Sequence, residues 1–389
     1  MARVSCTKVF AAVAAIAVLA IAVLALLPDG GPDGPGPEEH EPIPDRYTYD
    51  PATMVLKADR VQTWHIRDLH HAFLDVDGLE YTGYTVPDTD RVVLEPGRYE
   101  VTADGDTDVM QLGDTLVRTV GWDYSSGGLV HAMSVDVSID IGEFAASSGR
   151  SSSFNTDNRN DSYSGYLFRG LPCLVETGDC IRGLESDLRK AYLEIGGSPD
   201  DRQSYADFLA GFVQMSVEYP QRLSGHGEDY AVWGHDEYWC TPLETLYHMV
   251  GDCEDKAALL CSLYDAAGYG YAMGGHSGHV FAGVRIDGYR LPDAETVSGL
   301  ADRGLSECSD RGILSYSMAP YEGHGSLRTE PPVEKSDTVY MAVETIRGQV
   351  PVGFLAGGME HLDRETPHWG WAGFYTDETK VTLPGEHRA

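Results

Sequence analysis

Basic side chains are scarce in this sequence. It contains 28 Lys and Arg residues against 61 Asp and Glu residues, which gives a formal net charge of -33 at pH 7. A chain with this charge repels the phosphate groups of nucleic acids, so we exclude binding to DNA, RNA or another polyanion. The acidic excess does not by itself identify a function.

Motifs for metals and cofactors are also missing. The seven cysteines have no paired spacing of the kind that binds zinc, and no glycine-rich loop is present for a phosphate or a dinucleotide. Asp104, Asp106 and Asp108 have the spacing with which a calcium loop begins, but Val109 stands where that loop needs a glycine. We interpret this segment as a solvated turn and expect neither a cofactor nor a metal.

One long apolar run lies near the N-terminus. Val9–Leu27 are consecutive apolar residues without a charge, and at about 1.5 Å per residue a helix of this length spans roughly 28 Å, close to the thickness of the hydrocarbon core. Basic residues precede the run and acidic residues follow it, which places the N-terminus in the cytoplasm. We favour an uncleaved anchor at residues 1–27 over a cleaved signal peptide. The protein is then a single-pass protein of the cell membrane with extracellular folded domains.

The rest of the chain divides into a spacer and two folded units. Residues 28–45 are rich in proline, glycine and acidic residues and form a linker. Residues 46–180 have an apolar period of mostly two, clearest over Met133–Ile141, where apolar residues alternate with serine and aspartate. This pattern predicts a small β-rich, sandwich-like domain. We expect the stretch Ser147–Ser164, rich in serine and asparagine, to be a loop.

Residues 181–389 begin with a helical pattern. Apolar residues recur at intervals of three and four over Ile181–Ile195 and again over Tyr205–Val213, which predicts two helices that face a core. A third helix is expected after Thr241, where Pro242 suits the first turn and Glu244 can complete a capping box. With the strands that follow, the fold class of this unit is α+β.

Two segments of this unit carry chemistry. Gly251–Leu260 is a loop glycine followed by good helix formers, which puts Cys253 at the start of a buried helix, where unpaired N–H groups and the helix dipole stabilise a thiolate. A buried or disulfide-bonded cysteine is the plainer alternative. Gly278–Ile286 then reads as a strand with His279 at its start. An imidazole there can hold Cys253 as a thiolate and later protonate a leaving group.

At these residues the chain resembles the transglutaminase-like superfamily. The stretches that match are FVQMSVEY (Phe212–Tyr219), TPLETL (Thr241–Leu246), GDCEDKAALLCSL (Gly251–Leu263), GHVFAGV (Gly278–Val284) and YMAVET (Tyr340–Thr345). The resemblance implies a papain-like core with Cys253 as the nucleophile and His279 as the base. It also implies that Gln214 is an oxyanion-hole donor beside the backbone N–H of Cys253, although an ordinary polar residue next to a helix core is the alternative.

The acid that completes the triad departs from the usual spacing. Asp293 lies 14 residues after His279 and resembles the turn-and-strand position that many family members use. Glu344 lies in a stronger strand, in a segment that resembles the branch with a glutamate before a threonine. We favour Glu344, because Pro292 weakens strand pairing beside Asp293. Residues 287–336 are then an insertion over the site, and their glycines favour a mobile flap.

These observations predict a membrane-anchored thiol enzyme that hydrolyses peptide or isopeptide amides of protein substrates at the cell surface through an acyl-thioester. Cross-linking of glutamine side chains to amines is the second enzyme hypothesis, and a catalytically idle surface binding module is the alternative from another class. Because thiols oxidise outside the cell, Cys173 and Cys180 can close a local disulfide, whereas Cys253 has to stay free.

Overall fold

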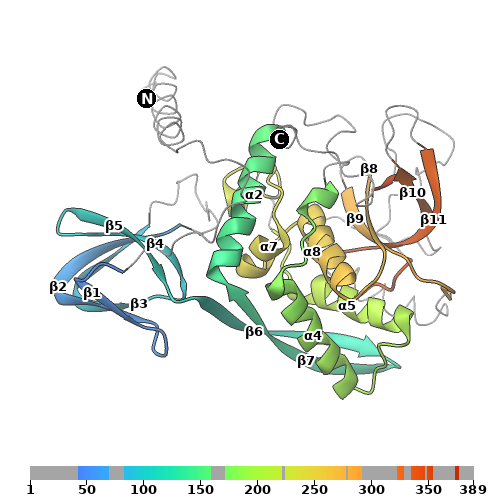
Figure 1. The fold of residues 1–389 in the computed structure, drawn as a ribbon, viewed down its shortest axis with the longest axis horizontal. Coiled ribbons are helices and arrows are strands. Elements are labelled where there is room, and N and C mark those ends of the chain that lie inside the picture. Colours follow the sequence, from blue (N-terminus) through green and yellow to red (C-terminus); the bar gives the residue numbers. More distant parts are fainter. Residues whose placement is uncertain are drawn as a thin grey trace, which may run out of the picture. The chain divides into compact units, whose positions relative to one another are not determined.

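The structure is a computed structural model. Within the residues that it describes, the chain is a mixed α+β protein in which a curled antiparallel sheet is followed by a helical region with small sheets (Figure 1). No helix among these residues is both long enough and apolar enough to cross a membrane. The expected anchor, most of the expected linker, Asp293 and most of the expected insertion at residues 287–336 lie outside them. The described residues are 43–69, 83–158, 171–220, 224–276, 279–290, 322–327, 334–346, 348–353 and 373–375.

Among the described residues, seven strands come first, the helices follow, and five more strands come last. In chain order they are β1 (Tyr47–Asp50), β2 (Val55–Asp68), β3 (Tyr84–Val93), β4 (Gly97–Ala103), β5 (Asp106–Leu112), β6 (Thr115–Ser126), β7 (Leu129–Asp140), α2 (Ile141–Asn158), the 3-10 helix η1 (Leu171–Leu174), α4 (Asp179–Glu194), α5 (Arg202–Ser216), α6 (Tyr230–Trp233), α7 (Pro242–His248), α8 (Cys253–Ala266), β8 (Tyr271–His276), β9 (His279–Val284), β10 (Glu322–Leu327), β11 (Glu334–Val343) and β12 (Gly373–Tyr375).

The first sheet contains β1 to β5 and has its own core. The long strand β2 pairs antiparallel with β1, β3 and β4, and β4 pairs with β5. Alternate residues of β4 are buried, as the period of two requires. The buried face gathers Leu56, Trp64, Ile66 and Val101, which are all fully buried. A single curled sheet with one apolar face therefore stands where a sandwich was expected.

The hairpin β6–β7 belongs to a second core. The alternation predicted over Met133–Ile141 is confirmed, because every second residue from Met133 to Ile141 is buried. The hairpin packs against α4 and α5 (Figure 1). At this contact, the ring of Trp122 meets that of Phe212 edge-on, with 5.2 Å between centroids. The second core runs from Leu116 to Val352. The hairpin β6–β7 therefore shares its core with the helices that follow it.

The predicted loop Ser147–Ser164 is helical over most of its length, because α2 extends to Asn158. Hydrogen bonds dock this helix. Ser151 donates to the carbonyl oxygen of Trp239 (2.6 Å), and the amide of Asn155 pairs with both the N–H and the carbonyl of Trp239 (2.9 and 3.0 Å). These tertiary contacts override the weak helix propensity of serine and asparagine.

No disulfide joins any two of the described cysteines, which are Cys173, Cys180, Cys240, Cys253 and Cys261. The expected bridge between Cys173 and Cys180 is therefore absent from the structure. The sulfur of Cys180 accepts a hydrogen bond from the N–H of Asp140 (3.2 Å), and burial raises the pKa of this thiol to about 12. Cys180 is thus a packed core residue.

Helix α8 is the centre of the second core. Every residue from Cys253 to Tyr264 is buried. The helices predicted over Ile181–Ile195 and Tyr205–Val213 are confirmed as α4 and α5, and the predicted capping box before α7 is also present. Beside these helices, β8 to β12 close a barrel in the order β10-β11-β9-β8-β12. Strand β10 lies inside the expected insertion and pairs with β11, so this part of the insertion belongs to the barrel.

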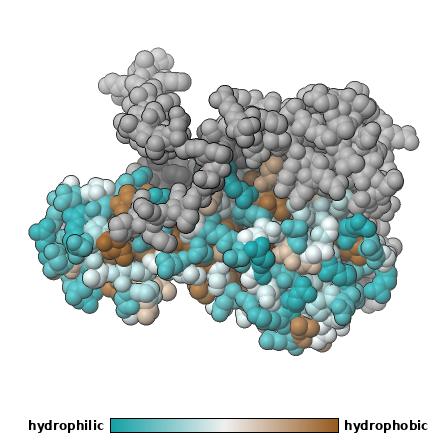
Figure 2. Space-filling model, in the orientation of Figure 1, coloured by the Kyte–Doolittle hydropathy of each residue, from teal (hydrophilic) through white to brown (hydrophobic). Residues whose placement is uncertain are grey.

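The coloured surface in Figure 2 is mostly hydrophilic, with hydrophobic residues in separate patches. This agrees with the acidic composition. Apolar side chains exposed singly are normal on a soluble surface.

Candidate active site

Cys253 is the first residue of α8. The helix begins here because Asp252 has extended backbone angles and forms a reciprocal capping box with Asp255. Gly251 allows this tight start, since a Cβ at that position would lie 2.7 Å from the Cβ of Asp255. Cys253 is only 7% exposed. The sequence prediction of a cysteine at a buried helix N-terminus is confirmed.

His279 and Glu344 are neighbours across two strands. His279 begins β9, Glu344 directly follows β11, and these strands pair antiparallel. Nε2 of His279 lies 3.1 and 3.2 Å from the two carboxylate oxygens of Glu344. Glu344 is fully buried, and its Oε1 also accepts hydrogen bonds from the N–H groups of Thr345 (2.9 Å) and Ile346 (3.3 Å). The carboxylate is therefore fixed by the turn that follows it.

The thiol of Cys253 reaches the same imidazole. A hydrogen bond between Cys253 and His279 contributes to the pKa of each. Because Nε2 of His279 is engaged by Glu344, Nδ1 is the ring nitrogen that remains for the sulfur. The N–H of Val280 also donates to Sγ of Cys253 at 3.4 Å. Cys253, His279 and Glu344 are far apart in the sequence but thus lie at one site, with the thiol beside the imidazole and the imidazole beside the carboxylate.

Burial and charge set the ionisation of this chain. Burial raises the pKa of Cys253, and the negative charge of Asp252 raises it further, whereas His279 lowers it. Burial alone would lower the pKa of His279, but the charge of Glu344 and the hydrogen bonds with Cys253 and Glu344 raise it well above its ordinary value. The position of Cys253 at a helix N-terminus is therefore not enough to lower the pKa of its thiol below the ordinary value. The charged imidazole is the main group that favours the thiolate.

Gln214 lies on α5 and is fully buried. Its Nε2 donates to the carbonyl oxygens of Glu344 (2.6 Å) and Val350 (3.0 Å), and its Oε1 accepts from the N–H of Val350 (3.1 Å). A glutamine amide has two N–H groups, and both are engaged. In this arrangement Gln214 has no donor for an oxyanion, in contrast to the role that the family resemblance implied.

Thr345 and Lys256 are site residues that the sequence analysis missed. The hydroxyl of Thr345 donates to the carbonyl oxygen of Cys253 (3.3 Å), which ties the end of β11 to the start of α8. The ammonium group of Lys256 is fully buried and donates to the carbonyl oxygen of Val217 (2.7 Å). The threonine directly after Glu344 and the lysine in the first turn of α8 are the only local signals for these contacts.

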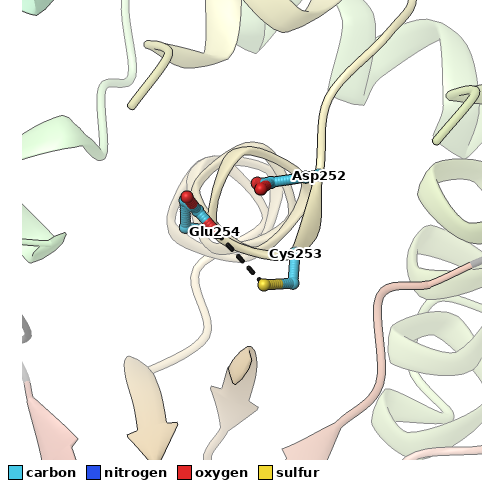
Figure 3. A group of neighbouring side chains, drawn as sticks. All are labelled: Asp252, Cys253 and Glu254. Carbon is cyan, nitrogen blue, oxygen red and sulfur yellow. Dashed lines mark hydrogen bonds between the residues drawn. The ribbon is translucent and has the colours of Figure 1, made fainter. Parts of the chain in front are cut away.

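Carboxylates crowd the start of α8. Asp252, Cys253 and Glu254 have ligand atoms within 4.8 Å of one another, and the thiol donates to Oε2 of Glu254 at 3.1 Å (Figure 3). Asp229, Asp252 and Asp255 form a second such group. These are the described residues that can hold a cation. The sequence analysis expected no metal and missed this cluster, whose local signal is three acids within four residues.

The acidic cluster is neutralised at least in part by protons. Burial, followed by mutual repulsion, raises the pKa values of Asp229, Glu254 and Asp255 well above their ordinary range, and burial raises that of Asp252 to about 7. One oxygen of each of Asp229, Asp252 and Glu254 is buried without a hydrogen-bond partner. Such atoms are stable only where the charge of the carboxylate is compensated or removed.

No protein-family model, no curated protein and no solved structure matches this chain. The candidate active site therefore stands on the geometry of Cys253, His279 and Glu344, and the likeness to the transglutaminase-like superfamily stays a prediction from the residues.

Proposed function

We propose that this protein is a thiol enzyme of the transglutaminase-like superfamily with a papain-like core. Cys253 is the nucleophile, His279 the general base and acid, and Glu344 the acid that orients the imidazole. One observation carries the proposal. The two carboxylate oxygens of Glu344 lie 3.1 and 3.2 Å from Nε2 of His279, and the N–H of Val280, the residue after His279, donates to Sγ of Cys253 at 3.4 Å.

The reaction follows from these roles. His279 takes the thiol proton, and the thiolate of Cys253 attacks the carbonyl carbon of an amide. The backbone N–H at the start of α8 stabilises the oxyanion of the tetrahedral intermediate. The imidazolium protonates the departing amine, leaving a thioester on Cys253. Water, deprotonated by His279, then attacks the thioester, releases the carboxylic acid and restores the thiol, while Glu344 stabilises each imidazolium.

The substrates are peptide or isopeptide amides of proteins at the cell surface, to which an anchor at residues 9–27 would confine the enzyme. Hydrolysis is the default, because water is the abundant acceptor. Cross-linking is the second candidate and replaces water by a primary amine at the thioester.

The triad argues against an idle binding module. Glu344 is fully buried and faces the half-buried ring of His279, and burying a charged pair costs free energy that apolar packing would not. A binding surface gains nothing from such a pair next to a free thiol. A catalytic site needs it.

Trapping the acyl-enzyme tests the proposal. A reactive ester such as p-nitrophenyl acetate is mixed with the purified protein, the protein is quenched in acid, and peptide mass spectrometry locates the acetyl group. We expect acetyl on Cys253 in the wild type and none in Cys253→Ala. Cys261→Ala is the matched control, because Cys261 lies on the same helix and is fully buried.

The acceptor is tested in the same assay. If added cadaverine accelerates the loss of the acetyl group and becomes acetylated, the protein is an acyltransferase. If the decay depends on water only, it is a hydrolase. Absence of acetyl on Cys253 under all conditions, with acetylation elsewhere or nowhere, would contradict both enzyme hypotheses.

A further inference from the structure

The backbone at Glu344 is held from outside its own sheet. β11 pairs with β9 from Met341 to Val343, and this ladder ends one residue before Glu344. The carbonyl oxygen of Glu344 is instead bound by Gln214, a residue 130 positions earlier on α5, with a distance of 2.6 Å to Nε2. The position of the triad carboxylate therefore depends on a helix that carries none of the three triad residues.

The amide of Gln214 behaves like a peptide group of an additional strand. It donates to the carbonyl of Val350 and accepts from the N–H of the same residue, at 3.0 and 3.1 Å, while its second N–H reaches Glu344. One side chain thus fastens both ends of the segment 344–350. Gln214 is fully buried, and a buried polar group without a partner destabilises the fold. Losing these hydrogen bonds would therefore cost free energy.

We propose that Gln214 is a positioning residue of the triad, which holds the backbone of Glu344 so that its carboxylate stays within hydrogen-bond distance of His279. The inference rests on the proposed function of Cys253, His279 and Glu344. It differs from the oxyanion role, because Gln214 acts on the carboxylate at the far side of the imidazole and not on the substrate. A displacement of about 1 Å is enough to break a hydrogen bond of 3.1 Å.

The two roles give different results when the glutamine is removed. Loss of an oxyanion donor slows acylation but leaves the titration of His279 unchanged. Loss of a positioning residue weakens the contact between His279 and Glu344, so the imidazolium is less stable and the pKa of His279 falls. The titration of His279 is therefore a readout that is independent of turnover.

Gln349 supplies a matched control in the same segment. Its amide accepts from the N–H of Ser125 (2.7 Å) and donates to the carbonyl of Ser125 (2.8 Å) on β6. This is the same kind of amide-to-peptide pair, and it fastens the same segment 344–350. Both of these hydrogen bonds go to Ser125, so Gln349→Ala reports the effect of loosening the segment while the hydrogen bond from Gln214 to Glu344 stays in place.

The experiment compares Gln214→Ala, Gln214→Met and Gln349→Ala with the wild type. The His279 resonance is assigned among the 14 histidines by its loss in His279→Asn, and its pKa is read by NMR. The rate at which iodoacetamide alkylates Cys253 at pH 7 is measured on the same samples. We expect both Gln214 variants to lower the pKa of His279 by about 1 and to slow alkylation about tenfold, with less than a twofold change in Gln349→Ala.

Gln214→Met removes the hydrogen bonds but preserves the side-chain volume. It therefore separates the loss of the hydrogen bonds from the cavity that Gln214→Ala would leave. A wild-type titration of His279 in either folded Gln214 variant would overturn the positioning role, as would an equal shift in Gln349→Ala. Unfolding of both Gln214 variants would also overturn it, because Gln214 would then support the fold in general. Failure of the proposed function is distinguishable, because it would show as wild-type protein that forms no acyl-Cys253.

Discussion

A single carboxylate beside the thiol controls how readily Cys253 ionises. Asp252 carries a negative charge that, after burial, is the largest influence raising the pKa of Cys253. Asp252→Asn keeps an oxygen that can cap α8 but removes the charge. The pKa of Cys253 then falls, and the pH profile of its alkylation moves to lower pH.

Asp179→Asn is the control for this prediction, because Asp179 is an exposed residue in the first turn of α4. A profile that stays in place in Asp252→Asn, or moves to higher pH, would show that Asp252 is already neutral when Cys253 ionises.

The orienting acid gives the second residue-scale prediction. Glu344→Gln keeps the shape of the side chain and deletes its charge, so the imidazolium of His279 loses its main stabiliser and its pKa falls. We expect turnover of an acyl donor to drop at least about a hundredfold. Asp293→Asn should change it little. The reverse order of effects would move the triad onto Asp293.

The sequence was informative at this scale where a residue's environment is local. Cys253 could be predicted because the glycine before it and the helix formers after it define a helix start. The role of Gln214 could not, because its partners lie 130 and 136 residues away and a buried amide has no distinctive pattern in sequence. The raised pKa of Cys253 was also hidden, since burial at a helix tip is a tertiary property.

At the scale of the elements, helix α2 is held against the segment at Trp239 by side-chain hydrogen bonds. Asn155 satisfies both backbone groups of Trp239, and both residues are buried. Asn155→Ala leaves the N–H of Trp239 without its partner, whereas the carbonyl oxygen keeps its hydrogen bond from Ser151, so we expect the free energy of unfolding to fall by about 1–3 kcal/mol, measured by denaturant titration. Ala146→Ser, on the exposed side of the same helix, should change it by less than about 0.5 kcal/mol. Equal stability of the two variants would contradict this docking.

Helix α2 also shows why hydrophobic periodicity can miss a secondary-structure element. Periodicity identified α4, α5 and β7 because each buries an apolar face. It missed α2 because serine and asparagine dock that helix by hydrogen bonds, which leave no hydrophobic period. Periodicity also predicts that one face of β4 and of its neighbouring strands is buried, but it does not show what that face packs against. A sandwich was therefore predicted, whereas the structure has one curled sheet with its own core.

For the whole molecule, buried carboxyls make stability depend on pH. Burial raises the pKa of Asp207 and that of Asp252 to about 7, from an ordinary 3.8. Between pH 4 and 7 the folded chain keeps protons that the unfolded chain has released. The stabilisation is therefore complete below about pH 4 and is lost as the pH rises through 7.

Asp207→Asn tests this dependence, because the amide oxygen can still accept from the N–H of Val352, which lies 2.7 Å from Oδ1 in the wild type. We expect the slope of unfolding free energy against pH, between pH 4.5 and 6.5, to become less negative by up to about 1.4 kcal/mol per pH unit. Asp265→Asn, an exposed change on α8, is the control. An unchanged slope in Asp207→Asn would mean that this carboxyl is charged in the folded protein.

The central claim is that His279 activates Cys253, and one measurement tests it most directly. Iodoacetamide labelling of the purified protein from pH 5 to 10 is quantified for each cysteine by peptide mass spectrometry, in the wild type and in His279→Asn. The account predicts that Cys253 is labelled in preference to the fully buried Cys261 and that His279→Asn slows labelling of Cys253 at least about tenfold at neutral pH. Equal rates for Cys253 in the two proteins across the pH range would contradict it.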